Sequence, residues 1–180
     1  MTFAPTVRPV CCLLPGTLLG SKGRWDLYRH RSAEVISMLI ADLLRHKGSS
    51  VVTIAPGESI MSLLASLSEH RVGALVVLDL DEIVGIISER DVVRSLHQKG
   101  AAVLDAPVSE LMSSPVVSCT PDDPIDRIAE LMTENRFRHM PVVTDGRLVG
   151  IVTIGDVVAA RIRQLEFDRK HLERYISQGA

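Results

Sequence analysis

The stretch GIISERDVV at residues 85–93 returns 65 positions later as GIVTIGDVV at residues 150–158. Each copy has a glycine, two apolar residues, a Ser or Thr, two variable residues, an Asp and two valines. When residues 49–93 are set against the residues 65 positions further on, 14 of the 45 pairs are identical and no gap is needed. A repeat of this length indicates two copies of one structural unit.

Both copies predict the same order of elements. A β-branched run stops before Pro56 or Pro121, because proline cannot continue a strand ladder. Apolar residues at helical spacing follow, and Asp123 is expected to cap the helix of the second copy. Two short strands come next, joined in the second copy by the turn signal Asp145-Gly146. The Ser/Thr-x-x-Asp motif ends the last strand and opens another helix, so we expect a mixed α/β (α+β) fold of two β-α-β-β-α units.

Each unit has only about 55 to 60 residues, a size at which an isolated core is marginal. We therefore expect the apolar sheet faces of the two units to pack on each other with pseudo-twofold symmetry. Met38 opens the first well-patterned segment and is a candidate for the natural start of the protein. The expected parts are a poorly ordered N-terminal extension (1–37), a first domain (38–103), a second domain (104–162) and a C-terminal helical extension (163–180).

The composition argues against several classes of function. The 180-residue chain carries a net charge of −2, so it has no global basic field to hold nucleic acid or an anionic membrane. Three Phe, two Tyr and one Trp are too few for a base-stacking platform. No apolar run approaches the roughly 20 residues that span a bilayer. Cys11, Cys12 and Cys119 form no disulfide framework, which indicates a reduced, cytoplasmic protein.

Motifs for catalysis and for metal binding are absent from the sequence. It contains no Gly-rich phosphate loop, HExxH, CxxC or GxSxG stretch. Its six histidines are scattered without the spacing of metal ligands. We therefore expect no catalytic residues, no metal site and no required cofactor, and we predict that the protein is not an enzyme.

Two tandem β-α-β-β-α units that end in this motif resemble a pair of cystathionine-β-synthase-type (CBS) domains, the arrangement called a Bateman module. The resemblance covers roughly residues 38–160 and rests on the doubled motif with its preserved spacing. It implies a stand-alone regulatory module in which the Asp of each motif binds the ribose of an adenine nucleotide and the hydroxyl lies near ribose or phosphate. The residues so implied are Ser88 with Asp91, and Thr153 with Asp156.

The motif has a physical reason to bind such a ligand. A hydroxyl at the end of a strand and an Asp one helical turn later both lie at a helix N-terminus, where free amides and the helix dipole favour anions. An acidic side chain there can accept hydrogen bonds from ribose hydroxyls. The alternative is a capping box, which ties off the free amides and needs no ligand. A capping box prefers Glu or Gln at this position and does not require the glycine, so the doubled motif favours a binding site, and the two roles can coexist.

Basic residues differ between the copies. In the stretch RFRHMPVV, Arg138 and His139 match the position from which basic side chains reach the phosphates in related modules, and Arg90 is a further phosphate candidate. We therefore expect two unequal half-sites. Family resemblance places the adenine against the end of the first strand of each copy, at Thr53, Ile54, Ser118 and Cys119, although Cys119 also fits a small buried apolar residue.

The function expected from the sequence is a non-catalytic regulatory module. It binds AMP, ADP or ATP, with NAD possible as well, in the cleft between the CBS repeats and responds by a change of conformation or oligomeric state. The alternative is a structural oligomerisation or adaptor domain without a functional ligand. Such modules commonly pair, so we expect a homodimer. Apolar residues at three-four spacing from Val158 onwards predict one long C-terminal helix, which either lies on its own module or serves as a dimer seam or as the docking arm for a protein partner.

Overall fold

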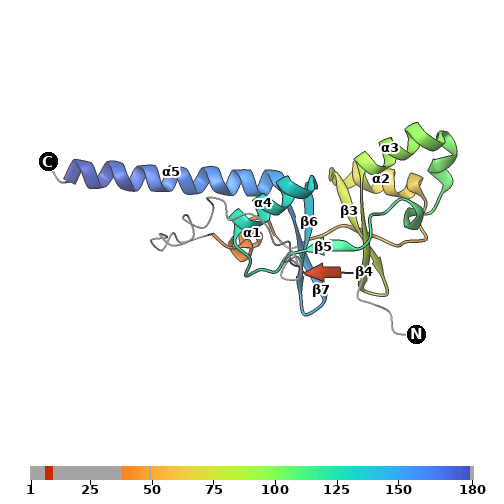
Figure 1. The fold of residues 1–180 in the computed structure, drawn as a ribbon, viewed down its shortest axis with the longest axis horizontal. Coiled ribbons are helices and arrows are strands. Elements are labelled where there is room, and N and C mark those ends of the chain that lie inside the picture. The colour runs from red at the N-terminus through yellow and green to blue at the C-terminus, as the bar shows by residue number, and fades with distance from the viewer. Residues whose placement is uncertain (1–6, 10–37, 49, 179–180) are drawn as a thin grey trace, which may run out of the picture.

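The structure is a computed structural model that describes residues 7–9, 38–48 and 50–178 (Figure 1). Small sheets stand side by side, with helices on their outer faces, and the C-terminal helix α5 projects far from this body. Cys11, Cys12 and most of the N-terminal extension lie outside the described residues. Within the extension, β1 (Val7–Pro9) forms a short strand parallel to β5.

The first unit has the predicted β-α-β-β-α order. Its elements are β2 (Thr53–Ile54), α2 (Ile60–His70), β3 (Ala74–Asp79), β4 (Glu82–Ser88) and α3 (Glu89–Lys99). The sheet order is β2-β3-β4, in which β2 runs parallel to β3 and β4 runs antiparallel to it. The apolar residues at helical spacing become the buried face of α2, with Ile60 and Leu63 fully buried.

The second unit repeats this order. Its elements are β5 (Val116–Ser118), α4 (Ile125–Asn135), β6 (His139–Thr144), β7 (Arg147–Thr153) and α5 (Ile154–Gln178). The pairing of His139 with Thr153 across β6 and β7 matches that of Ala74 with Ser88, 65 residues earlier, so the registers agree as well as the order. Cys119 continues β5 by a parallel bridge to Val142.

One local prediction in the second unit is wrong. Pro124 stands at the N-cap of α4 with no side-chain cap, and Asp123 does not cap the helix. The Asp123 carboxylate turns back instead and accepts hydrogen bonds from Thr120, at 2.7 Å from its backbone nitrogen and 3.0 Å from its hydroxyl. Asp123 therefore closes the turn that leads into the helix.

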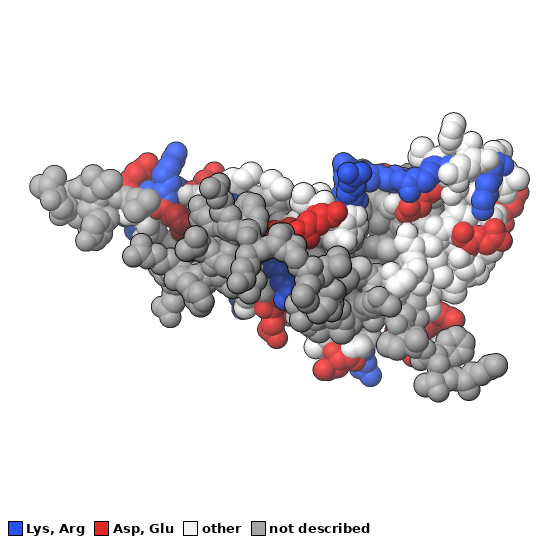
Figure 2. Space-filling view, viewed as in Figure 1, with Lys and Arg blue, Asp and Glu red and all other residues white. Residues whose placement is uncertain are grey.

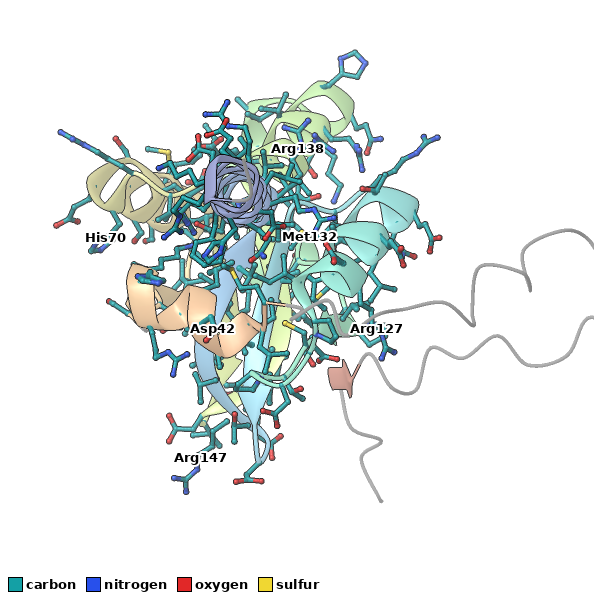
Figure 3. All side chains as sticks on the ribbon, turned by 90° about the vertical axis from the view of Figure 1, so that its left-hand side faces the viewer. Asp42, His70, Arg127, Met132, Arg138 and Arg147 are labelled. Atoms are coloured by element: carbon teal, nitrogen blue, oxygen red, sulfur yellow. The ribbon has the colours of Figure 1, made fainter. Side chains whose placement is uncertain are left out.

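The segments that precede the two units cross over. Helix α1 (Ile40–Lys47) leads into the first unit, but Ile40 and Leu43 are buried in the core of the second, beside Ile128, Met132 and Met140. Figure 3, which looks along α5, shows α1 and α4 on opposite sides of the β6–β7 hairpin. The chain between α3 and β5 forms the 3-10 helices η3 (Ala101–Asp105) and η4 (Val108–Glu110), and these pack on the first unit. Each unit is thus completed by the segment that leads to the other.

The two units pack through their sheets, as the sequence predicted. A third buried cluster contains Val76, Ile83 and Val116, with Ile86 and Ile151 packed against it, so it takes residues from both units. Burial of these side chains stabilises the contact by about 25 cal/mol for each Å² of apolar surface removed from water. In an isolated half, the buried residues of this cluster would be exposed to water.

The glycine that opens each motif is explained by packing. A Cβ atom on Gly85 would collide with the side chain of Met112, and one on Gly150 would lie 2.6 Å from Cδ2 of Leu44. Met112 follows η4, and Leu44 belongs to α1. The repeated glycine therefore admits the crossing segments, so its presence does not by itself argue for a ligand.

Candidate functional site

The first motif lies where β4 passes into α3. Asp91, in the first turn of α3, accepts two hydrogen bonds from Ser88: the backbone nitrogen lies 2.9 Å and the hydroxyl 2.5 Å from Asp91 Oδ2. This is the capping-box geometry that the sequence left as an alternative. Both contacts use one carboxylate oxygen, and no further partner of Asp91 occurs among the described contacts. Its other oxygen, Oδ1, is therefore available to a donor.

The second motif has the same geometry with one added partner. Asp156 Oδ2 accepts from the Thr153 nitrogen at 2.8 Å and from the Thr153 hydroxyl at 2.7 Å. The ammonium of Lys47, at the end of α1, lies 2.5 Å from the same oxygen. Partial burial raises the pKa of Asp156, but the hydrogen bonds from Lys47 and Thr153 outweigh it and hold that pKa below its ordinary value.

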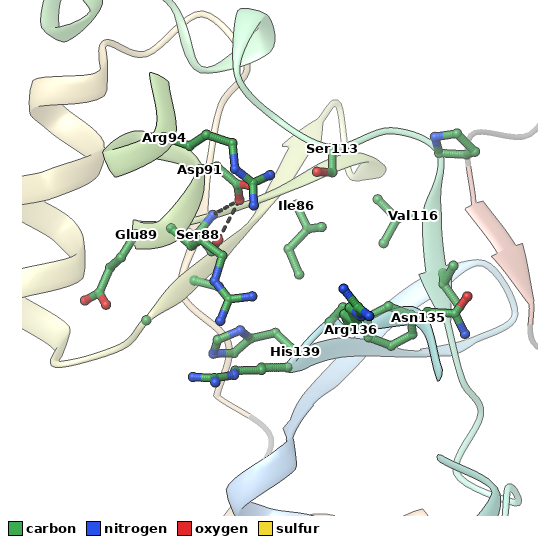
Figure 4. Close-up of a pocket in the computed structure, with 17 residues that line it drawn as sticks. Ile86, Ser88, Glu89, Asp91, Arg94, Ser113, Val116, Asn135, Arg136 and His139 are labelled. Carbon is green, nitrogen blue, oxygen red and sulfur yellow. Dashed lines mark hydrogen bonds between the residues drawn. The ribbon is translucent and has the colours of Figure 1, made fainter. Parts of the chain in front are cut away.

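A cavity of about 460 Å³ opens beside the first motif (Figure 4). One side comes from β4 and the start of α3, and the facing side comes from the loop between α4 and β6 in the second unit. Val116 and Val117 of β5, with Ser113 and Pro115 before them, line the space between. The cavity gathers five of the residues predicted to bind ribose or phosphate: Ser88, Arg90, Asp91, Arg138 and His139.

The lining of this cavity is basic. Four arginines contribute to it against two acids, Glu89 and Asp91; the arginines are Arg90, Arg94, Arg136 and Arg138. Figure 2 shows Lys and Arg side chains gathered along the upper edge, between the two units. In Figure 4, Arg94 lies beside Asp91, while Arg136 and His139 lie across the cavity on the second unit. Guanidinium groups arranged around a carboxylate can hold phosphates while the carboxylate holds a sugar.

Comparison with known proteins identifies the repeat. The family model of the CBS domain matches residues 40–98 and again residues 108–163. The chain belongs to the CBS-domain family. The protein named CBS domain-containing protein CBSX3, mitochondrial, of Arabidopsis thaliana is 33% identical over 152 residues, which cover 79% of this chain and 74% of that protein.

Two solved CBS structures are informative relatives. The CBS-domain protein ATU1752 from Agrobacterium tumefaciens is 45% identical with a TM-score of 0.68, covering 69% of this chain and 99% of that chain. The CBS domain pair of protein MJ0100, solved in complex with 5′-methylthioadenosine and S-adenosyl-L-methionine, is 29% identical with a TM-score of 0.62, covering 69% of this chain and 95% of that chain. A CBS pair of this kind supports a regulatory role.

The other predicted residues of this CBS pair lie outside the cavity. Thr153 and Asp156 belong to the second motif, whose surroundings include Lys47. Thr53 is exposed on β2, whereas Ile54, Ser118 and Cys119 are buried, at 8%, 2% and 1% exposure. Burial, with the nearby Asp123 charge, raises the pKa of the Cys119 thiol to about 12, so Cys119 is inert as a nucleophile.

His139 lies between the two motifs of the CBS pair. An added Cβ on Gly73 would lie 3.5 Å from His139 Nε2 and 3.8 Å from a carboxylate oxygen of Glu89, which places His139 close to the start of α3. Burial is the main reason why the pKa of His139 lies below 6.5, and Lys47 and Arg138 add to the effect, while Glu89 and Asp156 oppose it. His139 is therefore largely neutral near pH 7.

Sequence reasoning missed several cavity residues. Arg94, Asn135 and Phe137 line the cavity but were not candidates, and Arg136 was not carried into the predicted site. Arg94 follows Asp91 by three residues on α3, and this helical spacing was a signal that could have found it. Arg136 adopts a left-handed backbone with φ 58° at the end of α4, as Arg71 does with φ 53° at the end of α2. That conformation turns the chain from helix to strand in both units.

Within the residues that the structure describes, no group of three or more His, Cys, Asp and Glu side chains could hold a metal ion. Over the same residues, no helix is both long and apolar enough to cross a membrane.

Proposed function

We propose that this CBS pair is a non-catalytic regulatory module that binds an adenine nucleotide in the cavity beside Asp91. The observation that carries the proposal is the composition of that cavity. The first unit supplies a carboxylate at a helix N-terminus, and the second unit supplies arginines across a space of about 460 Å³. A ribose with an attached phosphate group has matching chemistry, namely hydroxyl donors next to an anion.

Each side chain has a proposed role in this complex. Asp91 accepts hydrogen bonds from the ribose hydroxyls through Oδ1, and the Ser88 hydroxyl stays near the ribose or phosphate. Arg138 and Arg90 pair with phosphate oxygens, as do Arg94 and Arg136. Val116 and Val117 of β5 and Ile86 of β4 offer the apolar surface against which a base can stack, and the two valines lie immediately before Ser118 and Cys119.

The related CBS pairs support the ligand class. MJ0100 was solved with methylthioadenosine and S-adenosylmethionine, both of which contain adenosine. The arginines of the cavity favour a ligand that also carries phosphate, so AMP, ADP, ATP and NAD are the proposed ligands. The reduced, cytoplasmic location expected from the sequence remains a prediction, and the Arabidopsis relative carries the word mitochondrial in its name.

Thermal melting with added ligand tests this function. A ligand present at 100 times its dissociation constant adds about 2.7 kcal/mol to the stability of the folded state. For a chain of this size, this corresponds to a rise of about 5 to 10 °C in melting temperature. We expect such a rise with AMP, ATP or NAD at millimolar concentration, a smaller one with adenosine and none with buffer alone. Absence of a shift with every adenine compound would contradict the proposal.

A second role, as an oligomerisation or adaptor module, is favoured by α5. This helix exposes four large apolar side chains, each more than half accessible: Val158, Ile162, Leu165 and Phe167. Three of them follow the three-four spacing of a helix seam. We propose that they form a homodimer contact or receive a protein partner. Light scattering of the protein and of Leu165→Glu tests the homodimer, because an added charge in such a seam is expected to give monomers.

A further inference from the structure

The carboxylates of the two Asp residues of the repeat differ in their hydrogen-bond partners. Asp91 is hydrogen-bonded to Ser88 through one oxygen, whereas Asp156 is also bound by the Lys47 ammonium at 2.5 Å. The Lys47 ammonium also lies 3.2 Å from the carbonyl oxygen of Ile151. Lys47 is thus held by two acceptors of the second motif, although 109 positions separate it from Asp156 in the sequence.

Among the residues that the structure describes, no lysine or arginine forms an ion pair with Asp91 in the way that Lys47 does with Asp156. Counting 65 residues on from Lys47 leads to Met112, whose apolar side chain packs against Gly85. The carbonyl of Ile86, the counterpart of Ile151, accepts instead from the backbone nitrogen of Ser113 at 2.8 Å. In the second unit the lysine side chain therefore takes the place of a backbone donor and reaches on to the carboxylate.

The position of Lys47 matters for a ligand. Oδ2 of Asp156 already accepts from the Thr153 nitrogen and hydroxyl, so the ammonium adds a third donor to one oxygen. A carboxylate has about four lone-pair sites. A ribose that binds there must share the remaining sites with a cation that lies directly beside them.

The ion pair is also displaceable. The Lys47 side chain is 35% exposed and that of Asp156 is 24% exposed, so water screens the pair. Lys47 is the last residue of α1, and Gly48 follows it with a φ of 89°. The ammonium sits at the end of a flexible four-carbon side chain and can swing away without moving the helix.

We propose that Lys47 is an intramolecular competitor for the ribose-binding position of Asp156. It keeps the second motif closed to adenosine-type ligands while the first motif stays open. This inference rests on the proposed function, because it assumes that the Asp of a motif binds ribose. It adds a specificity-determining residue that lies outside both motifs and makes the two half-sites unequal.

The test measures adenosine binding to the second motif alone. Asp91→Asn removes the ribose contact of the first motif, and Lys47→Met is then added, because methionine keeps the length of the side chain without its charge. Calorimetry with adenosine, which has no phosphate for the lysine to attract, is expected to show affinity about fivefold or more higher in the double variant than in Asp91→Asn. The gain is expected to disappear when Asp156→Asn is added.

A matched control comes from the same helix. Arg45→Met removes a cation two residues earlier, where Arg45 is 75% exposed and pairs with Asp42. This change is expected to leave adenosine affinity unaltered. Circular dichroism melts of all variants check that α1 and the fold are retained. If Lys47→Met left adenosine affinity unchanged or weakened it, Lys47 would be a spectator or a binding residue, and the proposal would be overturned.

The outcomes separate this proposal from the function itself. If the unaltered protein binds adenosine at the Asp91 cavity and Lys47→Met opens no second site, only the role of Lys47 fails. If neither the unaltered protein nor any variant binds an adenine compound, both proposals fail. An NMR titration of the Asp156 carboxyl adds a readout without ligand, because loss of the Lys47 partner is expected to raise its pKa, and an unchanged pKa would contradict the ion pair.

Discussion

The Asp91 and Asp156 motifs share their sequence pattern and their capping geometry, but their neighbours differ. Around Asp91 the second unit brings Arg136, Arg138 and His139, and α3 brings two more arginines. Around Asp156 the positions equivalent to Arg90 and Arg94 are held by Gly155 and Ala159, and Lys47 contacts the carboxylate. The motif itself supplies an aspartate acceptor and a hydroxyl. The segments packed over it decide whether a ligand can reach that acceptor and which charge the ligand can carry.

The largest difference is expected from the two aspartates themselves. Asp91→Asn is expected to weaken AMP binding by about tenfold to a hundredfold, because it removes hydrogen bonds to a charged acceptor. Asp156→Asn is expected to change AMP affinity by less than about threefold, because Lys47 already occupies that carboxylate. Calorimetry with AMP measures both. Equal losses in the two variants would show that the sites are equivalent.

A second comparison uses the two glycines. Gly85→Ala is expected to lower the free energy of unfolding by about 1 to 3 kcal/mol, because its Cβ would meet the Met112 side chain along several atoms, including the stiff Cβ. Gly150→Ala is expected to lower the free energy of unfolding by less, because the new Cβ would meet a methyl group at the end of the Leu44 side chain. Urea denaturation gives both values. The reverse order would show that α1 packs more rigidly than the segment after η4.

A smaller effect is expected from the cavity arginines. Arg94→Ala is expected to weaken ATP binding by about three- to tenfold and adenosine binding by less than about twofold, because a guanidinium pairs with phosphate and not with ribose. The reciprocal variant, Ala159→Arg, places an arginine at the equivalent position of the second unit. The difference between ATP and adenosine should shrink as salt is raised, since exposed charges are screened. A uniform loss for both ligands would point to damaged packing instead.

The smallest effect concerns His139. Its folded pKa lies below 6.5, so between that pKa and 6.5 the unfolded chain binds more protons than the native one. Stability is therefore expected to fall as the pH is lowered from 7 through this window, and His139→Gln is expected to reduce that fall. Besides burial, the charges of Lys47 and Arg138 lower the pKa of His139, whereas those of Glu89 and Asp156 raise it. Paired melts at pH 7.5 and 5.5 measure the difference, and identical pH profiles would exclude the effect.

The repeat made much of the fold predictable. Order of elements, the end of each last strand at Ser88 or Thr153, and the hairpin turn at Asp145-Gly146 all follow from local pattern, and the structure has them. The hairpin of the first unit turns through Leu80 and Asp81, both with positive φ, without any glycine to signal it. The register of this hairpin is held by the strands on either side. The identities of the turn residues therefore did not predict the turn.

The crossing segments were less predictable, since their partners lie far away in the chain. A short apolar pattern before a unit can indicate a helix, but local periodicity cannot say which unit buries that helix. The same limit applies to Lys47 and to Arg136, whose importance comes from contacts that only the packed pair creates. Asp123 shows the limit at short range, because two nearby donors on Thr120 compete with the helix amides for one carboxylate.

The exchange of leading segments also bears on how the protein could be divided. Cutting the chain between α3 and η3 would remove part of the hydrophobic core from each half. Ile40 and Leu43, which are buried in the second unit, would stay with the first unit, and Val108, which is buried in the first unit, would stay with the second. Neither product would own a complete hydrophobic interior, even though each would keep a full set of repeat strands. The duplicated halves have thus become mutually dependent, and a stable single repeat would have to be redesigned with its leading segment transplanted from the other half.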